Sequence, residues 1–263
     1  MSRLAIIAGR GDLPSLVAGL LPEPPLVCAP QGLAPDGLAV DRVFRFERLV
    51  PFLRQLVEDG IDRVAFAGAM SRPEFDPALF DPATAQLVPQ MLAAVAQGDD
   101  AMLRVAISFV EDAGMSVVGL ADIAPGLLMG QGVLGAVSAH PQNVADAARG
   151  QAILQALSPV DVGQGCVVAN GLCLGIEAIF GTDALLADVA VRRKGLGGVF
   201  VKRAKTGQDM RVDLPAIGPA TVQACRTAGL TGICVQAGRV VLLHRAEVIA
   251  QADAAGLAIW AVA

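Results

Sequence analysis

Apolar positions in the first half of the chain fall into short continuous runs, separated by longer stretches in which apolar residues recur at helical spacing. The continuous runs predict buried strands at residues 3–9, 24–30, 62–68 and 115–121. The amphipathic stretches predict helices at residues 51–60, 84–98 and 100–114. Strands that alternate with helices are typical of a parallel sheet, so we expect an α/β domain over residues 1–125.

The second half also alternates the two patterns. Six apolar runs predict strands at residues 166–171, 172–179, 198–204, 232–238, 240–245 and 257–263. Four amphipathic stretches predict helices at residues 144–157, 182–194, 219–229 and 246–256. We therefore expect a mixed α/β domain over residues 143–263, with a hairpin that turns near Gly238.

Residues 126–142, between the two halves, are expected to form a linker. No charged side chain occurs from Ile123 to Ala145, a stretch long enough to cross a bilayer. Glycine and proline residues such as Gly130 and Pro141 interrupt it, so we expect no transmembrane segment. The N-terminal apolar run is too short for a signal peptide, which favours a cytoplasmic location.

The composition of the chain indicates which partners it disfavours and which redox state its cysteines take. The net charge of −5, the absence of Tyr and the single Trp argue against a nucleic-acid partner, because binding would need positive charge and stacking side chains. The five cysteines sit in apolar stretches without CxxC spacing, so we expect reduced core residues. We expect structural roles for both histidines, His140 and His244.

The first candidate motif is IIAGRGDLP, in which an apolar strand runs into Gly9, Arg10 and Gly11 before a helix that begins near Pro14. Glycines at such a turn allow close backbone approach, and amides at a helix start bind phosphate. A purely structural strand-to-helix turn remains the alternative. The third small residue and the ribose-binding acid of a dinucleotide fingerprint are missing, which argues against an NAD-dependent nucleotide-sugar oxidoreductase.

Further polar residues lie at predicted strand and helix ends. Gly68, Ser71 and Arg72 lie at the carboxyl end of a predicted strand, where open α/β sheets usually contact ligands. Asp99 and Asp100 precede a predicted helix, which fits either an N-cap or a contact to ribose or base.

The second half has its own polar group. Thr182 and Asp183 follow Gly181 at a predicted helix start and are either a cap or substrate contacts. The segment DVGQG contains Gln164. A basic run continues a buried-looking strand and fits either a solvated face or a diphosphate site: Lys202, Arg203 and Lys205, followed by Arg211.

These motifs occur together in one known family. IIAGRGDLP, FAGAMSRPEF, QGDDAMLR, DVGQG, GTDALL and RVDLPAIGP follow one another along the chain. In this respect the chain resembles the LpxI-type UDP-2,3-diacylglucosamine pyrophosphatases of lipid A synthesis over essentially its whole length. The resemblance implies an N-terminal Rossmann-like domain, a distinct C-terminal domain carrying the catalytic aspartate, and a homodimer that exchanges elements between subunits.

The resemblance also implies the reaction and its residues. UDP-2,3-diacylglucosamine would be hydrolysed to UMP and 2,3-diacylglucosamine 1-phosphate with a divalent metal, for which we expect Mg²⁺. The family's essential aspartate falls on Asp213, and the diacylated substrate implies peripheral contact with the inner membrane. The implied substrate-binding residues are Gly9, Gly11, Gly68, Ser71, Arg72, Asp100, Gln164, Thr182, Asp183 and Arg211.

The chain departs from the family pattern at two places. Arg10 stands where the family has the central glycine of three, which puts an arginine, and not a bare backbone, at this turn. The linker reads GAVSAH where we expect a lysine and a proline, which weakens any role for the linker in the site.

The chemistry of the side chains refines these roles. Arg211 and nearby lysines should keep Asp213 ionised near neutral pH, which suits a metal ligand better than a general base. Mg²⁺ commonly takes one or two protein carboxylates and completes its shell with water and phosphate. We expect Lys202 and Lys205 to reach the diphosphate together from one side of an extended stretch and to stabilise developing charge. A sensor that binds a nucleotide-sugar without turnover is the alternative function.

Overall fold

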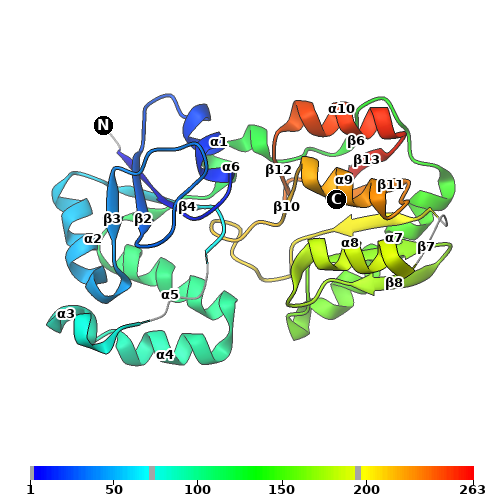
Figure 1. The fold of residues 1–263 in the computed structure, drawn as a ribbon. Coiled ribbons are helices and arrows are strands. Elements are labelled where there is room, and N and C mark those ends of the chain that lie inside the picture. The colour runs from blue at the N-terminus through cyan, green and yellow to red at the C-terminus, as the bar shows by residue number, and fades with distance from the viewer. Residues whose placement is uncertain (1–2, 71–74, 193–196) are drawn as a thin grey trace. The chain divides into compact units, whose positions relative to one another are not determined.

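The computed structural model describes residues 3–70, 75–192 and 197–263, and the chain forms two compact units (Figure 1). The first unit comprises Met1–Pro125 and Asp209–Asp213, and the second comprises Gly126–Gln208 and Leu214–Ala263. The short segment that carries Asp213 therefore packs with the N-terminal unit, although it lies in the second half of the sequence.

The first unit is built on the parallel sheet that the apolar runs predicted. Its strands are β1 (Leu4–Ala8), β2 (Leu26–Pro30), β3 (Arg42–Phe44), β4 (Arg63–Ala67) and β5 (Ser116–Val117), in the order β3-β2-β1-β4-β5. All four pairings are parallel. The chain leaves β1 toward one edge and returns to β4 for the other, so the switch point of this Rossmann-like sheet lies between β1 and β4.

The helices of the first unit are α1 (Leu13–Leu20), α2 (Leu49–Glu58), α3 (Pro82–Ala85), α4 (Val88–Gln97), α5 (Asp99–Asp112) and α6 (Leu120–Ile123), with the 3₁₀ turns η1 (Phe46–Arg48) and η2 (Pro77–Leu79). The turn η3 (Pro125–Leu127) begins at the last residue of this stretch and continues into the second unit. The helix predicted at 84–98 is divided in two, because Pro89 lacks the N–H that a continuous helix needs and falls in the first turn of α4. Gly98 is the N-cap of α5, so the expectation that Asp99 and Asp100 precede the helix is wrong.

Two further predictions for the first unit need correction. The strand expected at 115–121 shrinks to β5, because the chain turns into α6 at Gly119, whose N–H donates to the Asp122 carboxylate at 3.1 Å. Strand β3, only three residues long, was not predicted, since so short a run has no detectable period.

The second unit contains a six-stranded mixed sheet, which agrees with the predicted mixed α/β domain. Its strands are β6 (Gly132–Leu134), β7 (Gly165–Ala169), β8 (Leu172–Ile176), β9 (Val199–Lys202), β11 (Gly232–Gln236) and β13 (Ala258–Val262), in the order β6-β13-β11-β9-β7-β8. The central strands β9, β11 and β13 are parallel, and β6, β7 and β8 run antiparallel to their neighbours. Part of the expected linker is thus the edge strand β6.

The hairpin expected near Gly238 is wrong. Strand β11 already has β9 and β13 on its two sides, so the following strand β12 (Val241–Leu242) pairs instead with β10 (Ala216–Ile217), in parallel. The hairpin of this unit joins β7 to β8 through Asn170 and Gly171, which have φ values of 50° and 76°. Two positive φ values at Asn-Gly define the tight turn that suits a hairpin.

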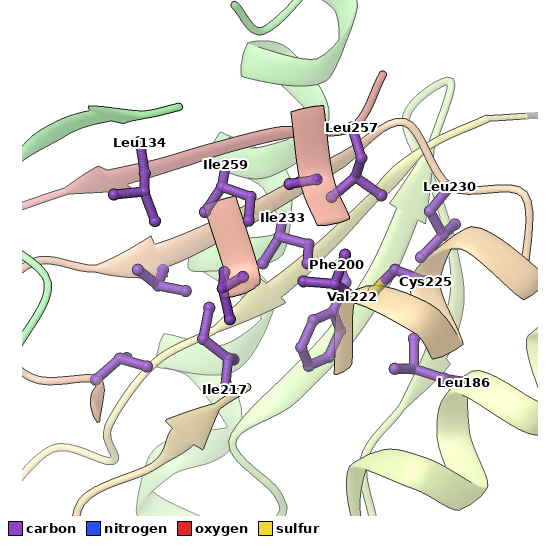
Figure 2. Close-up of a cluster of buried hydrophobic side chains, with 14 of the residues drawn as sticks. Leu134, Leu186, Phe200, Ile217, Val222, Cys225, Leu230, Ile233, Leu257 and Ile259 are labelled. Carbon is purple, nitrogen blue, oxygen red and sulfur yellow. The ribbon is translucent and has the colours of Figure 1, made fainter. Parts of the chain in front are cut away.

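Helices cover both faces of the second sheet: α7 (Pro141–Leu157), α8 (Gly181–Arg192), α9 (Pro219–Thr227) and α10 (Arg245–Ala255), with the turn η4 (Ser158–Val160). Phe200, Ile233 and Ile259 point to the face that α8, α9 and α10 cover (Figure 2). Alternate residues such as Val201 and Cys234 point to the opposite face, against α7. The period-two pattern of these strands therefore places two cores, one on each side of the sheet.

Two sequence expectations concern the surface. None of the described helices combines the length and hydrophobicity needed to cross a bilayer. All five cysteines are free thiols, and Cys28, Cys166, Cys225 and Cys234 are buried as expected, but Cys173 is exposed on the edge strand β8. Burial raises the pKa of Cys28, Cys166 and Cys234 to about 12, so these thiols are poor nucleophiles.

Candidate functional site

The glycines of the first motif lie at the switch point of the parallel sheet. Gly9 directly follows β1, and its N–H donates to the Ala67 carbonyl at the end of β4 at 2.8 Å. Arg10 and Ala69 exchange two backbone hydrogen bonds of 2.9 Å, which join the β1 and β4 loops. A Cβ on Gly9 would lie 2.4 Å from the Ala69 carbonyl oxygen, so only glycine permits this contact.

Gly68 completes the same junction from the β4 side. Its φ is +93°, and a Cβ on it would lie 2.8 Å from the Arg10 carbonyl oxygen. Gly11 has a φ of +88° with open space around the Cβ position. Gly9 and Gly68 are thus required for the close backbone packing of the β1 and β4 loops. The backbone at Gly11 instead faces open space at the carboxyl edge of the sheet, where a ligand is expected.

A clamp of charged side chains holds the segment Asp209–Asp213 on the first unit. The Arg211 Nε lies 3.0 and 3.2 Å from the two oxygens of Asp209, and Nη2 donates to Oδ2 at 2.7 Å. The third nitrogen, Nη1, donates to Glu111 Oε1 on α5 at 2.8 Å. The Arg211 hydrogen bonds hold the pKa of Asp209 below its usual value, and the two carboxylates raise that of Arg211.

Backbone packing fixes this segment against the end of β5. The Cβ position of Gly119 lies 3.0 Å from the Arg211 Cα, so a larger residue at 119 would displace the segment. Asp213 N–H donates to the Asp209 carbonyl at 3.4 Å, which closes one turn around the clamp. Asp213 is half-buried. It therefore stands on a segment that the sheet end and α5 both anchor.

Lys202 is buried in the second unit, away from solvent. Its Nζ donates to Glu177 Oε2 at 2.7 Å and to the Thr182 hydroxyl at 2.6 Å. The Thr182 hydroxyl donates in turn to the same Glu177 oxygen at 2.7 Å. The side chains of Lys202 and Glu177 are only 6% and 11% exposed, so this triad is an internal ion pair.

Lys205 belongs to a different pair. Its Nζ contacts Asp161 Oδ1 at 2.5 Å, with side chains 25% and 57% exposed. The expectation that Lys202 and Lys205 share one side of an extended stretch is wrong, because β9 ends at Lys202 and residues three apart on a strand point to opposite faces.

The remaining predicted residues of the second unit have local partners. Gln164 Nε2 donates to the Gln208 side-chain oxygen at 3.0 Å, and its carbonyl accepts from the Arg203 N–H at 2.9 Å. Asp183 is exposed in the first turn of α8, as the helix-start reading predicted. Ser71 and Arg72 lie outside the described residues, and Asp100 is described only as a residue of α5.

The carboxylates around Asp213 bear on the expected metal. Among the described residues, no group of three or more His, Cys, Asp or Glu side chains converges as a metal cage. Both oxygens of Asp209, and one oxygen of Glu111, already accept from Arg211. The described side chains therefore fit a Mg²⁺ ion that one protein carboxylate would hold, with phosphate oxygens and water as its other ligands.

Three of the residues that build these arrangements were missed from the sequence. Glu177 is a carboxylate inside the apolar run LCLGIEAIF, and a charge in such a run signals a buried partner. Asp209 precedes Arg211 by two residues, but an acid close to an arginine is too common to single out. Glu111 is 100 positions from Arg211, and nothing in the sequence joins the two.

Comparison with known proteins adds independent findings. The family model described as the LpxI N-terminal domain matches residues 3–127, and the model described as the LpxI C-terminal domain matches residues 130–260. The chain is similar to a curated protein of Caulobacter vibrioides named UDP-2,3-diacylglucosamine pyrophosphatase LpxI. The two are 34% identical over 277 residues, which cover 100% of this chain and 98% of that relative.

Proposed function

Since the chain belongs to the LpxI family, we propose that it hydrolyses the pyrophosphate bond of UDP-2,3-diacylglucosamine to UMP and 2,3-diacylglucosamine 1-phosphate. The observation that carries this proposal is the full-length similarity to a protein that bears this activity in its name. Both units match, so the similarity includes the β1 turn and the Asp213 segment alike. The chain is accordingly a hydrolase acting on a diphosphate bond.

The switch point of the first sheet is the proposed place for part of the nucleotide-sugar diphosphate. Backbone at Gly11 is open there, and Arg10 carries a positive charge on an exposed side chain beside it. Arg10 replaces the glycine that the family pattern expects at this turn. Its guanidinium can pair with a phosphate, which supplies binding energy that the backbone of a glycine would otherwise contribute.

Asp213 is the proposed catalytic carboxylate, and Arg211 positions it. All three guanidinium nitrogens of Arg211 donate to Asp209 or Glu111, so its main task is to hold the Asp213 segment against α5. A carboxylate on an anchored segment is already in place for catalysis, which avoids the entropy cost of ordering it.

We propose Asp213 as the protein ligand of a divalent metal, Mg²⁺, that is shared with the diphosphate. When bound, the metal supplies Lewis-acid polarisation of a phosphoryl oxygen and lowers the pKa of a water. Because the described residues include no cage of three or more His, Cys, Asp or Glu side chains, Mg²⁺ should bind tightly only together with the diphosphate.

The lysines take different roles in this proposal. Lys202 is a positioning residue, because its ammonium holds Glu177 and Thr182 inside the second unit. Lys205 is the more exposed of the two and remains the proposed cation for charge that develops on the phosphates.

A single assay tests the activity. We expect UMP release from UDP-2,3-diacylglucosamine with Mg²⁺, none with EDTA, and a loss of at least a hundredfold in kcat for Asp213→Asn. Asp112→Asn, an exposed carboxylate at the end of α5, is the matched control and should keep full activity. Tight substrate binding without UMP release in the wild type would reject the hydrolase and favour the nucleotide-sugar sensor.

We also propose that the chain acts as a cytoplasmic homodimer in peripheral contact with the inner membrane. Support comes from Ile179 and Phe180, which are 89% and 85% exposed next to the edge strand β8. Exposed apolar side chains of this size are typical of an interaction surface. Light scattering of the wild type and of Phe180→Ser, with vesicle co-sedimentation, separates self-association from membrane contact.

A further inference from the structure

The first unit contains a pocket at the outer edge of its parallel sheet, beside strand β3. Its volume is about 440 Å³, and the described residues that line it come from β3, η1 and α2, with one residue that follows β2. Figure 1 shows α2 next to β3 in this unit. Strand β2 separates β3 from β1, so the β3 pocket is not at the switch point between β1 and β4. The lining residues are Gln31, Arg42, Val43, Phe44, Arg45, Arg48, Pro51, Phe52 and Gln55.

The wall of the β3 pocket is positively charged. Arg42 begins β3, Arg45 is the N-cap of η1, and Arg48 is the last residue of η1, so the three arginines follow at intervals of three. Side chains three positions apart lie above one another in a 3₁₀ turn, which brings the guanidinium groups of Arg45 and Arg48 to one side. The described lining residues include no carboxylate, so the wall attracts an anion.

Acidic side chains on the neighbouring elements are already engaged. Asp41 Oδ2 accepts from a backbone N–H of β2 at 2.8 Å, and Glu47 Oε1 accepts from the Asp76 N–H at 3.0 Å. Asp59 forms an ion pair of 2.6 Å with Nη2 of Arg42. The other two arginines of the wall have exposed side chains that can turn toward a ligand.

Arg42 also keeps an unused hydrogen-bond donor. Its Nη1 is buried and has no hydrogen-bond partner among the described residues. A buried donor on a charged group costs free energy when it lacks an acceptor. An oxyanion in the pocket that Arg42 lines would supply this acceptor.

We propose that the β3 pocket binds a phosphate group, at a site separate from the diphosphate that is hydrolysed. The planar fork of an arginine matches two phosphate oxygens, and such charge-assisted pairs are among the strongest hydrogen bonds in proteins. The same chemistry is offered by a soluble diphosphate and by the headgroup of an anionic phospholipid. Val43 in the wall is 62% exposed, which gives a membrane an apolar contact beside the arginines.

The first test measures binding of inorganic pyrophosphate by calorimetry in the presence of EDTA. The reference protein is Arg10→Gln, because it lacks the arginine proposed to contact the substrate diphosphate. Arg45→Gln/Arg48→Gln is then added to this reference. Arg54→Gln/Arg149→Gln is the matched control, since both arginines are exposed, lie outside the pocket lining and change the net charge equally.

The second test uses vesicles to separate the two sources of phosphate. Co-sedimentation is measured with phosphatidylcholine vesicles that contain or lack phosphatidylglycerol. Loss of binding to the phosphatidylglycerol vesicles in Arg45→Gln/Arg48→Gln, and not in the control, would assign the pocket to a lipid headgroup. The same dependence for pyrophosphate alone would assign it to a soluble phosphate.

We expect Arg45→Gln/Arg48→Gln to weaken binding at least tenfold, because two charge-assisted contacts are lost, and the control to leave binding unchanged. If neither pyrophosphate nor the vesicles distinguish the two double variants, the pocket is not a phosphate site. Circular dichroism checks folding, and the single variant Arg45→Gln carries the same expectation should the double variant not fold.

Turnover decides whether the site is separate. Arg45→Gln/Arg48→Gln in the otherwise wild-type chain should leave kcat and KM unchanged for UDP-2,3-diacylglucosamine dispersed in a neutral detergent. A raised KM would place part of the substrate in the β3 pocket and overturn a separate site. The binding tests need no turnover, so absence of UMP release would reject the hydrolase and leave the phosphate site to be decided by them.

Discussion

The buried pair of Lys202 and Glu177 gives the sharpest test of the roles assigned to the basic run. Lys202→Met keeps much of the aliphatic stem and removes the ammonium that donates to Glu177 Oε2. The Glu177 carboxylate then stays buried without its cation and keeps the 2.7 Å hydrogen bond from the Thr182 hydroxyl. Removing one partner of a buried ion pair costs about 3–5 kcal/mol, because the other charge stays desolvated. The side chains are 6% and 11% exposed, so we expect Lys202→Met to fall in this range.

Lys205→Met is the matched control. Its partner Asp161 is 57% exposed, so the pair is screened by water and contributes less than about 1 kcal/mol. Both variants remove one lysine from the same short run of sequence. Only burial separates their expected effects on the free energy of unfolding.

Urea unfolding measures the difference. Trp260, the single tryptophan, is 6% exposed in β13 and reports the second unit by fluorescence. The double variant Lys202→Met/Glu177→Gln should recover a large part of the loss, since no uncompensated charge remains. If Lys202→Met unfolds within 1 kcal/mol of the wild type and yet loses hydrolysis, Lys202 acts on the substrate, and our assignment of a positioning role is refuted.

The remaining predictions concern the glycine junction and the clamp. Gly68→Ala should destabilise the first unit by more than about 2 kcal/mol in thermal unfolding, because it combines a positive φ with a Cβ 2.8 Å from the Arg10 carbonyl oxygen. Gly11→Ala also has a positive φ but meets open space, so it should cost only about 1 kcal/mol. Equal losses of stability in the two variants would contradict this reasoning. The pKa of Asp209 is lowered in the folded chain, so its pairing with Arg211 stabilises above the unfolded pKa of 3.8 and is lost as pH falls through the folded value. Asp209→Asn should therefore be less stable than the wild type at pH 7, and the two should converge below pH 4; a difference that does not change with pH would exclude this origin.

Strand and helix content followed from hydrophobic pattern wherever the pattern was long. The runs that contain β1, β2 and β4 are continuous and apolar because the parallel sheet is buried on both faces, and this is visible without coordinates. Strand β3 could not be predicted, because three residues are too few to show an alternation of apolar and polar positions. The break before α4 was missed, although Pro89 is a residue that interrupts helices.

Strand partners were harder to predict than strands. The run at Val241 has a strand pattern, but its neighbour depends on which edges are still unoccupied once β9 and β13 have paired with β11. The Asn170-Gly171 turn, by contrast, carries its own hairpin signal, since both residues accept positive φ.

The sequence by itself determined the family, the two α/β halves and the motifs that carry Asp213 and the glycine turn, because each depends on residues close together in the chain. Only the tertiary structure decided what the charged side chains do. Lys202 and Lys205 lie three positions apart, yet one is sealed against Glu177 and the other pairs with the exposed Asp161. Their partners lie 25 and 44 positions away, and Glu111 lies 100 positions from Arg211, so the local sequence cannot indicate these pairs.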